Sequence, residues 1–303
     1  MNRMLLWIVA VRPQFFTATI VPIALGAAVA RHDTGSFDWG LFWFTLMGGI
    51  LVHGGLNFTN DYYDFKTGND AANKMPTPFS GGSRFLREGI LKPRQVQMAG
   101  FICFAAGSAV GLYLNYICGG YTILLIGMAG VFIAYFYNAD PLKIGYTRLS
   151  EVTTGFGFGT LMVLGAYYVQ ARKLSWEAFF VSIPIAILIA LVQFINQFPD
   201  YEADKAVRKN NTVVVAGKAK AIRYYRFFMI SVYVIVLAGI AIGVFPFTAV
   251  IIFATLPAAI KAIKVASAHF DKIKELLPAN ALTIAIHLSF GILFTFAYLW
   301  GTK

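Results

Sequence analysis

Nine apolar segments, each close to the length of a membrane-crossing helix, constrain this chain more than any other feature. A helix needs about 20 predominantly apolar residues to cross the hydrocarbon core of a bilayer. Hydrophobic residues make up 58% of the 303-residue sequence and charged residues only 13%, against about a quarter charged in soluble domains. The sequence therefore predicts an all-α integral membrane protein with about nine transmembrane helices, in which residues 1–303 form a single domain. The segments cover about residues 14–31, 39–60, 96–117, 120–137, 152–171, 178–199, 226–245, 247–264 and 281–300.

The basic residues are distributed unevenly between the two sides of such a bundle. If the N-terminus is cytoplasmic, 21 of the 25 Lys and Arg residues fall on the cytoplasmic side, and the other side receives Arg31, Arg172, Lys173 and Lys303. Cytoplasmic loops are enriched in Lys and Arg, so we expect a multi-pass protein of the cell (cytoplasmic) membrane with its N-terminus inside. The net charge of +11 then reflects this topology first. The expected surrounding is the lipid bilayer, and no nucleic-acid partner is predicted. The expected cytoplasmic connections are about 61–95, 138–151, 200–225 and 265–280.

Two segments that resemble each other place acidic residues at the end of an apolar segment. Residues 57–70 read NFTNDYYDFKTGND, and residues 196–205 read NQFPDYEADK. Each contains Asn, then Asp four residues later, then Tyr, then a further Asp. Carboxylates in or beside a bilayer are costly and usually serve a function. These two segments are therefore the first candidates for a functional site.

Both segments are expected to present their polar residues on one face of a helix, because positions four apart lie one turn apart. Two such stripes that face each other form a negative, oxygen-rich cavity opening at the cytoplasmic side. Mg²⁺ is typically held by one or two carboxylates together with substrate phosphates, so this cavity predicts a magnesium site; solvated helix ends are the alternative. The stripes are His53, Asn57, Asp61 and Asp64 in one helix, and Gln193, Asn196 or Gln197, Asp200 and Asp204 in the other.

Basic residues in the same connections predict an anionic substrate. A diphosphate needs direct Lys or Arg contacts in addition to a metal ion. Gly81, Gly82 and Ser83 could add backbone N–H groups, although Gly-Gly alone usually marks a turn. The alternative for each cation is a charge that sets topology or contacts lipid headgroups. The candidates for diphosphate contact are Lys66, Arg84, Lys143, Arg148 and Lys209.

A third polar patch follows the fourth apolar segment, where residues 137–146 read YNADPLKIGY. Its Tyr137 and Tyr146 are expected close to the cavity, as are Tyr62 and Tyr201 of the acidic segments. Aromatic faces stabilise a developing cation, so these residues are candidates for contact with a cation or with an acceptor. Tyrosine is also a common anchor at membrane interfaces, which is the alternative for each of them.

Together these motifs resemble the UbiA superfamily of intramembrane prenyltransferases. The likeness rests on the two Asn/Asp segments, on Arg12-Pro13 before the first apolar segment, and on the Asp140-Pro141-Leu142 turn. Within the superfamily, the spacing of the first segment, followed by Gly81-Gly82-Ser83, is most similar to the 1,4-dihydroxy-2-naphthoate branch of menaquinone biosynthesis. One departure is that Asp64 follows Asp61 after three residues, where many family members have a spacing of four.

The resemblance implies Mg²⁺-dependent transfer of an isoprenyl group from a polyprenyl diphosphate to an aromatic acceptor, here 1,4-dihydroxy-2-naphthoate. Arg12 is a candidate contact for an acceptor carboxylate. His53 is a candidate base, and a histidine packed between helices is its alternative. The metal ligands that the resemblance implies are Asn57, Asp61, Asp64, Asn196, Asp200 and Asp204, with the four aspartates as catalytic residues.

Other functions remain open at this point. The acceptor could instead be 4-hydroxybenzoate, an archaeal-type glycerol-phosphate ether lipid, haem or a chlorophyll precursor. A cation-coupled membrane transporter also carries acidic residues in its helices, usually nearer the middle of the membrane. A CDP-alcohol phosphotransferase fits less well, because the Asp-Gly-x-x-Ala-Arg motif of that family is missing from the sequence.

Overall fold

The computed structural model describes residues 2–79 and 82–301, and every regular element within these ranges is a helix. Eight helical stretches there are long and apolar enough to cross a membrane. The segment predicted at 120–137 forms a helix of only 15 residues, α6 (Thr122–Phe136), about 22 Å long against the ~30 Å of a hydrocarbon core. The all-α membrane architecture is confirmed, with eight stretches of full spanning length in the described ranges rather than nine. These eight are Pro13–Thr34, Trp39–Thr67, Pro93–Cys118, Ser150–Ala171, Trp176–Ala206, Lys218–Ala241, Phe247–His269 and Ile273–Trp300.

Several of these stretches consist of shorter elements joined end to end. The stretch Ser150–Ala171, for example, contains a π-helical segment between two α-helices. In chain order the elements are α1 (Arg3–Ala10), η1 (Pro13–Phe15), α2 (Thr17–Thr34), α3 (Trp39–Thr67), α4 (Asn69–Ala72), α5 (Pro93–Cys118), α6 (Thr122–Phe136), η2 (Ile144–Tyr146), α7 (Ser150–Thr154), η3 (Gly155–Leu161), α8 (Met162–Ala171), α9 (Trp176–Ala206), α10 (Thr212–Ala216), α11 (Lys218–Ala241), η4 (Phe247–Thr255), α12 (Leu256–His269) and α13 (Ile273–Trp300).

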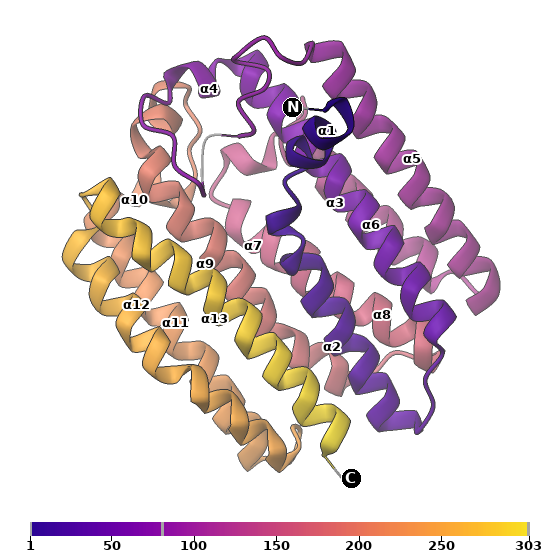
Figure 1. Ribbon diagram of the computed structural model, residues 1–303. Coiled ribbons are helices and arrows are strands. Elements are labelled where there is room, and N and C mark those ends of the chain that lie inside the picture. The colour runs from indigo at the N-terminus through magenta and orange to yellow at the C-terminus, as the bar shows by residue number, and fades with distance from the viewer. Residues whose placement is uncertain (1, 80–81, 302–303) are drawn as a thin grey trace.

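Helix α9 lies in the middle of the bundle (Figure 1). On one side it packs against α11 and α13, and on the other against η3 and α2. Ile185, Leu188 and Ile195 of α9 belong to one buried cluster with Tyr225 of α11 and Phe290 of α13. Helices α3, α5, α6 and α8 form the other half of the bundle beside α2 (Figure 1). Because lipid tails are as apolar as these side chains, close packing rather than water exclusion holds such helices together.

Close contact between η3 and α9 depends on glycine at two positions. A Cβ atom on Gly155 would lie 2.6 Å from the carbonyl oxygen of Ala186, and one on Gly159 would lie 2.5 Å from the Cα atom of the same residue. Neither neighbour is a flexible side chain. The absence of a side chain at these positions therefore sets the distance between the two helices.

Gly159→Ala is expected to lower the free energy of unfolding by about 1–3 kcal/mol, because the added methyl group forces η3 away from the α9 backbone. Gly157→Ala is the matched control, since its Cβ would meet only Ile133 Cγ2, at 3.4 Å. Thermal or denaturant unfolding of both variants in the same detergent measures the difference. Equal losses in the two variants would contradict this account of the packing.

The helices extend further into the polar segments than the apolar boundaries predicted. Helix α3 continues to Thr67 and α9 to Ala206, and only three residues separate α12 from α13. The connections at 61–95, 200–225 and 265–280 are thus shorter than expected. A helix satisfies its own backbone hydrogen bonds, so it continues past the apolar stretch wherever its polar side chains find partners.

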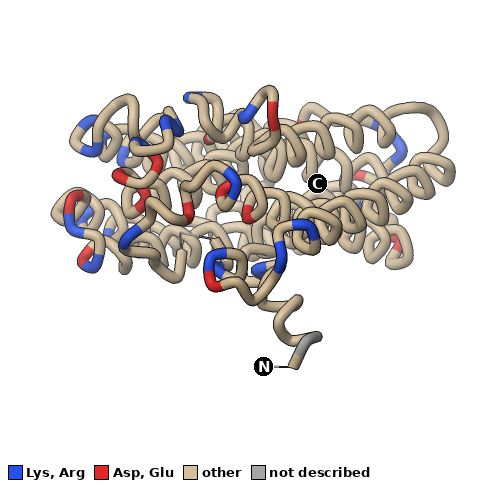
Figure 2. Tube along the Cα trace, turned by 90° about the horizontal axis from the view of Figure 1, so that it is seen from above, with Lys and Arg blue, Asp and Glu red and all other residues tan. Residues whose placement is uncertain are grey.

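The charged residues are unevenly placed along the bundle. Most Lys, Arg, Asp and Glu residues gather at the end of the helices that carries α4 and α10, while long stretches of the helices and the end near the C-terminus carry few (Figure 2). The acidic ends of α3 and α9 lie at this charged end. The polar part of any internal site must therefore lie there as well.

Candidate functional site

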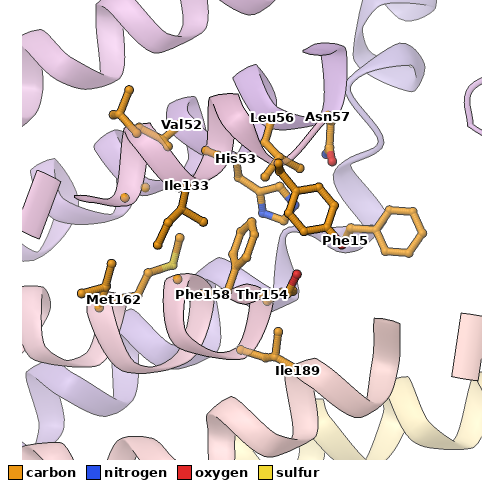
Figure 3. A pocket seen from close by; sticks show the side chains of 18 of the residues that line it. Phe15, Val52, His53, Leu56, Asn57, Ile133, Thr154, Phe158, Met162 and Ile189 are labelled. Atoms are coloured by element: carbon orange, nitrogen blue, oxygen red, sulfur yellow. The ribbon is translucent and has the colours of Figure 1, made fainter. Parts of the chain in front are cut away.

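A cavity of about 780 Å³ lies inside the bundle, and side chains of α2, α3, α5, α6, α9 and α13 line it. At the charged end its lining includes carboxylates and amides from the ends of α3 and α9. Elsewhere the lining is mainly apolar, as Figure 3 shows for Val52, Leu56, Ile133, Phe158 and Met162. The cavity therefore suits a ligand with a compact polar head and a larger apolar body.

The acidic ends of α3 and α9 meet around one lysine. Lys209 Nζ lies 3.7 Å from Asp64 Oδ1 and 3.7 Å from Asp204 Oδ1. The Lys209 side chain is 15% exposed, and those of Asp64 and Asp204 are 9% and 3% exposed. Burial alone would lower the pKa of Lys209, but the two carboxylates together raise it well above its usual value. The lysine is therefore held in its charged form between the two acidic segments.

Asparagine amides fix the carboxylates of the second segment. Asp204 accepts hydrogen bonds from Asn69 Nδ2 at 3.2 Å and from Asn211 Nδ2 at 2.7 Å. Asp200 Oδ1 accepts one from Asn73 Nδ2 at 2.8 Å. These three asparagines were not among the predicted site residues. A signal was available for two of them, because Asn69 lies within the first acidic segment and Asn73 lies one helical turn after it.

The turn of the chain at Gly68 brings these asparagines to the cavity. Gly68 ends α3 with a φ of 80°, a left-handed conformation that glycine adopts without steric cost. Helix α4 then packs against α9, and Asn69, Asp70 and Asn73 all line the cavity. The first acidic segment thus contributes side chains both from the end of α3 and from the short helix that follows.

The polar patch at 137–146 supports the carboxylate of Asp64. Tyr146 OH donates to Asp64 Oδ1 at 3.4 Å, and Asn60 Nδ2 donates to Asp64 Oδ2 at 2.9 Å. Asn138 Nδ2 in turn donates to Asn60 Oδ1 at 2.7 Å. Burial, together with the charge of Asp64, raises the pKa of Tyr146 to about 12. Tyr146 therefore keeps its proton and acts as a hydrogen-bond donor.

A second tyrosine of this patch lies on the cavity wall. Tyr137 lines the cavity, and its hydroxyl accepts a hydrogen bond from Gln193 Nε2 of α9. Burial raises the pKa of Tyr137 to about 12, so it too stays protonated. The contact joins the end of α6 to the polar stripe of α9.

Asp61 is paired with Arg12 and is not among the residues that line the cavity. Arg12 Nη2 lies 3.3 Å from Asp61 Oδ1, and the backbone N–H of Ser83 donates to Asp61 Oδ2 at 3.3 Å. Asn57 Nδ2 donates to the carbonyl oxygen of Val11 at 2.8 Å. These contacts attach the segment before α2 and the loop at Ser83 to α3. Arg12 and Asn57 nevertheless both reach the cavity wall.

The predicted diphosphate contacts divide into two groups. Lys209 lines the cavity, whereas Lys66, Arg84, Lys143 and Arg148 do not. Lys66 and Lys143 lie on the surface beside Asp140, with Nζ atoms 3.9 and 2.8 Å from its carboxylate oxygens. The hydrogen bond from Lys143 lowers the pKa of Asp140. Gly81 of the predicted phosphate loop lies outside the described residues.

The remaining predicted residues are placed as follows. Asn196 and His53 line the cavity, and Asn196 Oδ1 accepts a hydrogen bond from Asn280 Nδ2 at 2.8 Å. Tyr62 and Tyr201 lie away from it: Tyr62 packs with the cluster around Phe58, and the Tyr201 ring lies under Lys205 and Lys218. The cavity therefore gathers Arg12 and, of the five cations predicted to contact diphosphate, Lys209, together with most of the predicted carboxylates and one of the four tyrosines.

The raised pKa of Asp70 is expected to make the free energy of unfolding depend on pH. Burial, with the charges of Asp64 and Asp61, raises its pKa to about 7, above the value of about 3.9 in an unfolded chain. The folded protein then binds more protons than the unfolded one between pH 4 and 7, so stability falls as pH rises through this window. In metal-free buffer Asp70→Asn is expected to be more stable than the natural protein at pH 8, with a difference that shrinks toward pH 4. Unfolding temperatures at several pH values measure this, and a pH-independent difference would contradict it.

The donor set at the charged end fits a hard divalent cation. Asp64, Asp200 and Asp204 bring carboxylates to it, and the amide oxygens Asn69 Oδ1 and Gln197 Oε1 are buried without a hydrogen-bond donor. Across residues 2–79 and 82–301 no three His, Cys, Asp or Glu side chains already converge as a metal site. Buried oxygens that lack a protein donor are satisfied by an ordered water or by a cation. The chemistry of these residues thus suits Mg²⁺.

Solved structures share this fold. A UbiA homolog from Aeropyrum pernix K1 superposes with a TM-score of 0.68 at 15% identity, over 94% of this chain and 97% of that one. A UbiA homolog from Archaeoglobus fulgidus bound to GPP and Mg²⁺ gives a TM-score of 0.65 at 14% identity, over 97% and 99%. At this level of identity the likeness shows the fold alone.

Curated relatives and a family model agree on the family. The chain is 27% identical over 297 residues to 2-carboxy-1,4-naphthoquinone phytyltransferase of Synechocystis sp., covering 98% of this chain and 94% of the relative. It is 28% identical over 255 residues to 1,4-dihydroxy-2-naphthoate octaprenyltransferase of Bacillus subtilis, covering 84% and 79%. The resemblance to naphthoate prenyltransferases is confirmed, and a cation-coupled transporter is not supported. Because the model of the UbiA prenyltransferase family matches residues 19–289, the chain belongs to this family and is a prenyltransferase.

Proposed function

We propose that the protein transfers an isoprenyl group from a polyprenyl diphosphate to 1,4-dihydroxy-2-naphthoate, as a step of menaquinone biosynthesis. The observation that carries this proposal is the form of the cavity. One end holds Asp64, Asp204 and Lys209, and the rest is an apolar space within a total of about 780 Å³. A diphosphate requires the first part, and an isoprenoid chain with an aromatic acceptor requires the second.

At the charged end, Asp64, Asp200 and Asp204 would hold Mg²⁺ with the free amide oxygens of Asn69 and Gln197. When bound, Mg²⁺ neutralises the charge that develops on the departing diphosphate. Lys209 donates to the remaining diphosphate oxygens from its position between the two acidic segments. The other predicted cations, Lys66, Arg84, Lys143 and Arg148, do not line the cavity, so we assign them no contact with the diphosphate.

The apolar part of the cavity binds the isoprenoid chain and excludes water from the allylic cation that forms when the carbon–oxygen bond breaks. Phe15 and Phe158 line the cavity (Figure 3), and aromatic rings stabilise positive charge. Tyr137 and Asn57 lie between this part and the charged end. The electron-rich ring carbon of the acceptor attacks the cation at that boundary, and the diphosphate departs with the electron pair of the broken carbon–oxygen bond. The ring regains its aromaticity when the attacked carbon loses its proton, or its carboxylate as CO₂.

We further propose that residues 1–303 act as one integral-membrane domain in the cytoplasmic membrane, with the N-terminus and the charged end of the cavity on the cytoplasmic side. The excess of Lys and Arg on the loops at that end supports this orientation. Both substrates would then reach the site from the inner leaflet or the cytoplasm. Accessibility labelling of single cysteines placed in the α3–α5 and α8–α9 loops tests the orientation.

The choice of acceptor is supported by the relatives, two of which are named as enzymes that act on naphthoquinone or naphthoate compounds. A radiolabel transfer assay with purified protein in liposomes tests it, using geranylgeranyl diphosphate and a panel of aromatic acceptors. We expect 1,4-dihydroxy-2-naphthoate to be labelled. EDTA should abolish this labelling, and added Mg²⁺ should restore it. Labelling of 4-hydroxybenzoate or of an ether-lipid precursor instead would overturn the acceptor and keep the reaction class.

A further inference from the structure

One polar pair in the apolar part of the cavity stands apart from the charged end. His53 of α3 and Thr19 of α2 form a hydrogen bond of 2.8 Å between Nδ1 and Oγ1. Thr19 is fully buried, and His53 is 4% exposed and lines the cavity (Figure 3). A polar side chain in an apolar membrane helix is costly unless it is used. We therefore expect the pair either to bind a ligand or to stabilise the contact between α2 and α3.

The hydrogen-bonding needs of Thr19 fix the proton on the imidazole. A buried hydroxyl must donate its proton to an acceptor. Among the described residues the hydrogen bond of Thr19 Oγ1 to His53 Nδ1 is its only one, so Thr19 donates and Nδ1 accepts. A neutral imidazole that accepts at Nδ1 carries its hydrogen on Nε2. His53 thus presents an N–H donor from its other nitrogen.

This Nε2–H group has no partner within residues 2–79 and 82–301, although the His53 ring lies on the cavity wall. An isoprenoid chain has no atom that accepts a hydrogen bond, so it would leave the donor unsatisfied. An aromatic acceptor with oxygen substituents would satisfy it. The donor therefore favours the acceptor over the isoprenoid chain at this position.

The surroundings of His53 suit a flat ring. The Phe16 and Phe158 rings lie with centroids 5.2 and 4.5 Å from that of His53, at interplanar angles of 66° and 62°. Of these two rings, Phe158 lines the cavity, whereas Phe16 packs against His53 without lining it. An aromatic acceptor can therefore pack against Phe158 while it receives the hydrogen bond from His53.

The position of His53 along α3 leaves room for both substrates. Asp64 is eleven residues further along this helix, a rise of about 16 Å. A diphosphate held at Asp64 places its reactive allylic carbon part of the way toward His53. The rise of about 16 Å would leave space for an aromatic acceptor between that carbon and His53.

We infer that His53 binds the aromatic acceptor by donating a hydrogen bond from Nε2 to a hydroxyl oxygen on the acceptor ring. Thr19 is a positioning residue, because its hydroxyl fixes the tautomer that makes Nε2 a donor. This inference rests on the proposed function, since it names how the same cavity recognises its second substrate.

Steady-state kinetics of four variants test it. His53→Phe is expected to raise the KM for the acceptor about tenfold and to leave the KM for the polyprenyl diphosphate unchanged. His53→Gln, whose amide N–H can donate from a similar position, should recover part of this loss. Thr19→Val should also raise the KM for the acceptor. Thr19→Ser, which keeps the hydroxyl, should have the KM of the natural protein. Equal changes in both KM values, or no change in either, would overturn the inference.

Thr45→Val is the matched control for Thr19→Val. Unlike Thr19, Thr45 lines the cavity, and its hydroxyl donates to the carbonyl oxygen of Leu41 in its own helix and not to His53. Its removal should leave the KM for the acceptor unchanged. An increase as large as that of Thr19→Val would overturn the role of Thr19.

Acceptor analogues identify the oxygen and separate this inference from the proposed function. 1-Hydroxy-2-naphthoate and 4-hydroxy-2-naphthoate each lack one ring hydroxyl. For one of these two analogues, His53→Phe should no longer raise the KM. A rise in KM that persists for both would overturn the contact. If the natural protein prenylates only 4-hydroxybenzoate, the proposed acceptor fails, and the His53→Phe ratio measured with that substrate still tests the inference.

Discussion

Asp204→Asn is expected to lower kcat/KM for prenyl transfer by about 10²–10³-fold. Asparagine keeps the shape of the side chain, but its single amide oxygen can accept only one of the two hydrogen bonds that Asp204 accepts from Asn69 and Asn211. It removes the negative charge that faces Lys209 at 3.7 Å and that the proposed Mg²⁺ site requires. Loss of several kcal/mol of charge stabilisation in the transition state corresponds to this range. The radiolabel transfer assay at saturating Mg²⁺ measures it.

Asp140→Asn is the control for the loss of a carboxylate. The Asp140 side chain is 56% exposed and pairs with Lys143 at 2.8 Å on the surface, where such pairs contribute little. Its activity should stay within about twofold of the natural protein. Unfolding temperatures in detergent establish that both variants are folded. If Asp204→Asn retained more than about a tenth of the natural activity, the proposed role of this carboxylate would be rejected.

The fold was predictable because its main signal is local. Length and apolar content identify a membrane helix without reference to the rest of the chain, and each predicted segment is helical in the structure. The acidic ends of α3 and α9 were identifiable as a candidate site for a related reason, since a carboxylate is conspicuous where the neighbouring residues are apolar. The short α6 shows the limit of this signal, because apolar content without sufficient length does not give a full span.

The partners of each charged residue were not predictable, because they depend on how distant segments pack. Lys66 and Lys143 looked equivalent to Lys209 in the sequence, yet they pair with Asp140 on the surface. Asp61 looked equivalent to Asp64 in the sequence, yet Asp61 forms an ion pair with Arg12, which precedes α2. Ion pairs and hydrogen bonds form over only a few ångströms. Side-chain contacts at that scale follow from helix packing, which the pattern of residue types does not specify.

Lys209→Met is expected to lower the free energy of unfolding by about 3 kcal/mol in metal-free buffer. The substitution keeps the length of the side chain and removes the only positive group within 4 Å of Asp64 and Asp204 among the ion pairs of the described residues. Removing one partner of a buried ion pair leaves the other charge uncompensated, which costs about 3–5 kcal/mol. Denaturant unfolding in EDTA measures the loss. Lys143→Met, at the more exposed pair with Asp140, is the control and should change stability by less than about 1 kcal/mol.

Mg²⁺ separates a structural role of Lys209 from a role at the proposed metal site. If a divalent cation binds beside Asp64 and Asp204, it supplies the missing positive charge and should stabilise Lys209→Met more than the natural protein. A free Mg²⁺ concentration 100-fold above its Kd adds about 2.7 kcal/mol to a folded state that binds one ion. Prenyl transfer should stay low even in Mg²⁺, because the direct lysine contact to the diphosphate is still absent. Stabilisation by Mg²⁺ that is equal in both proteins would place the cation away from these two carboxylates.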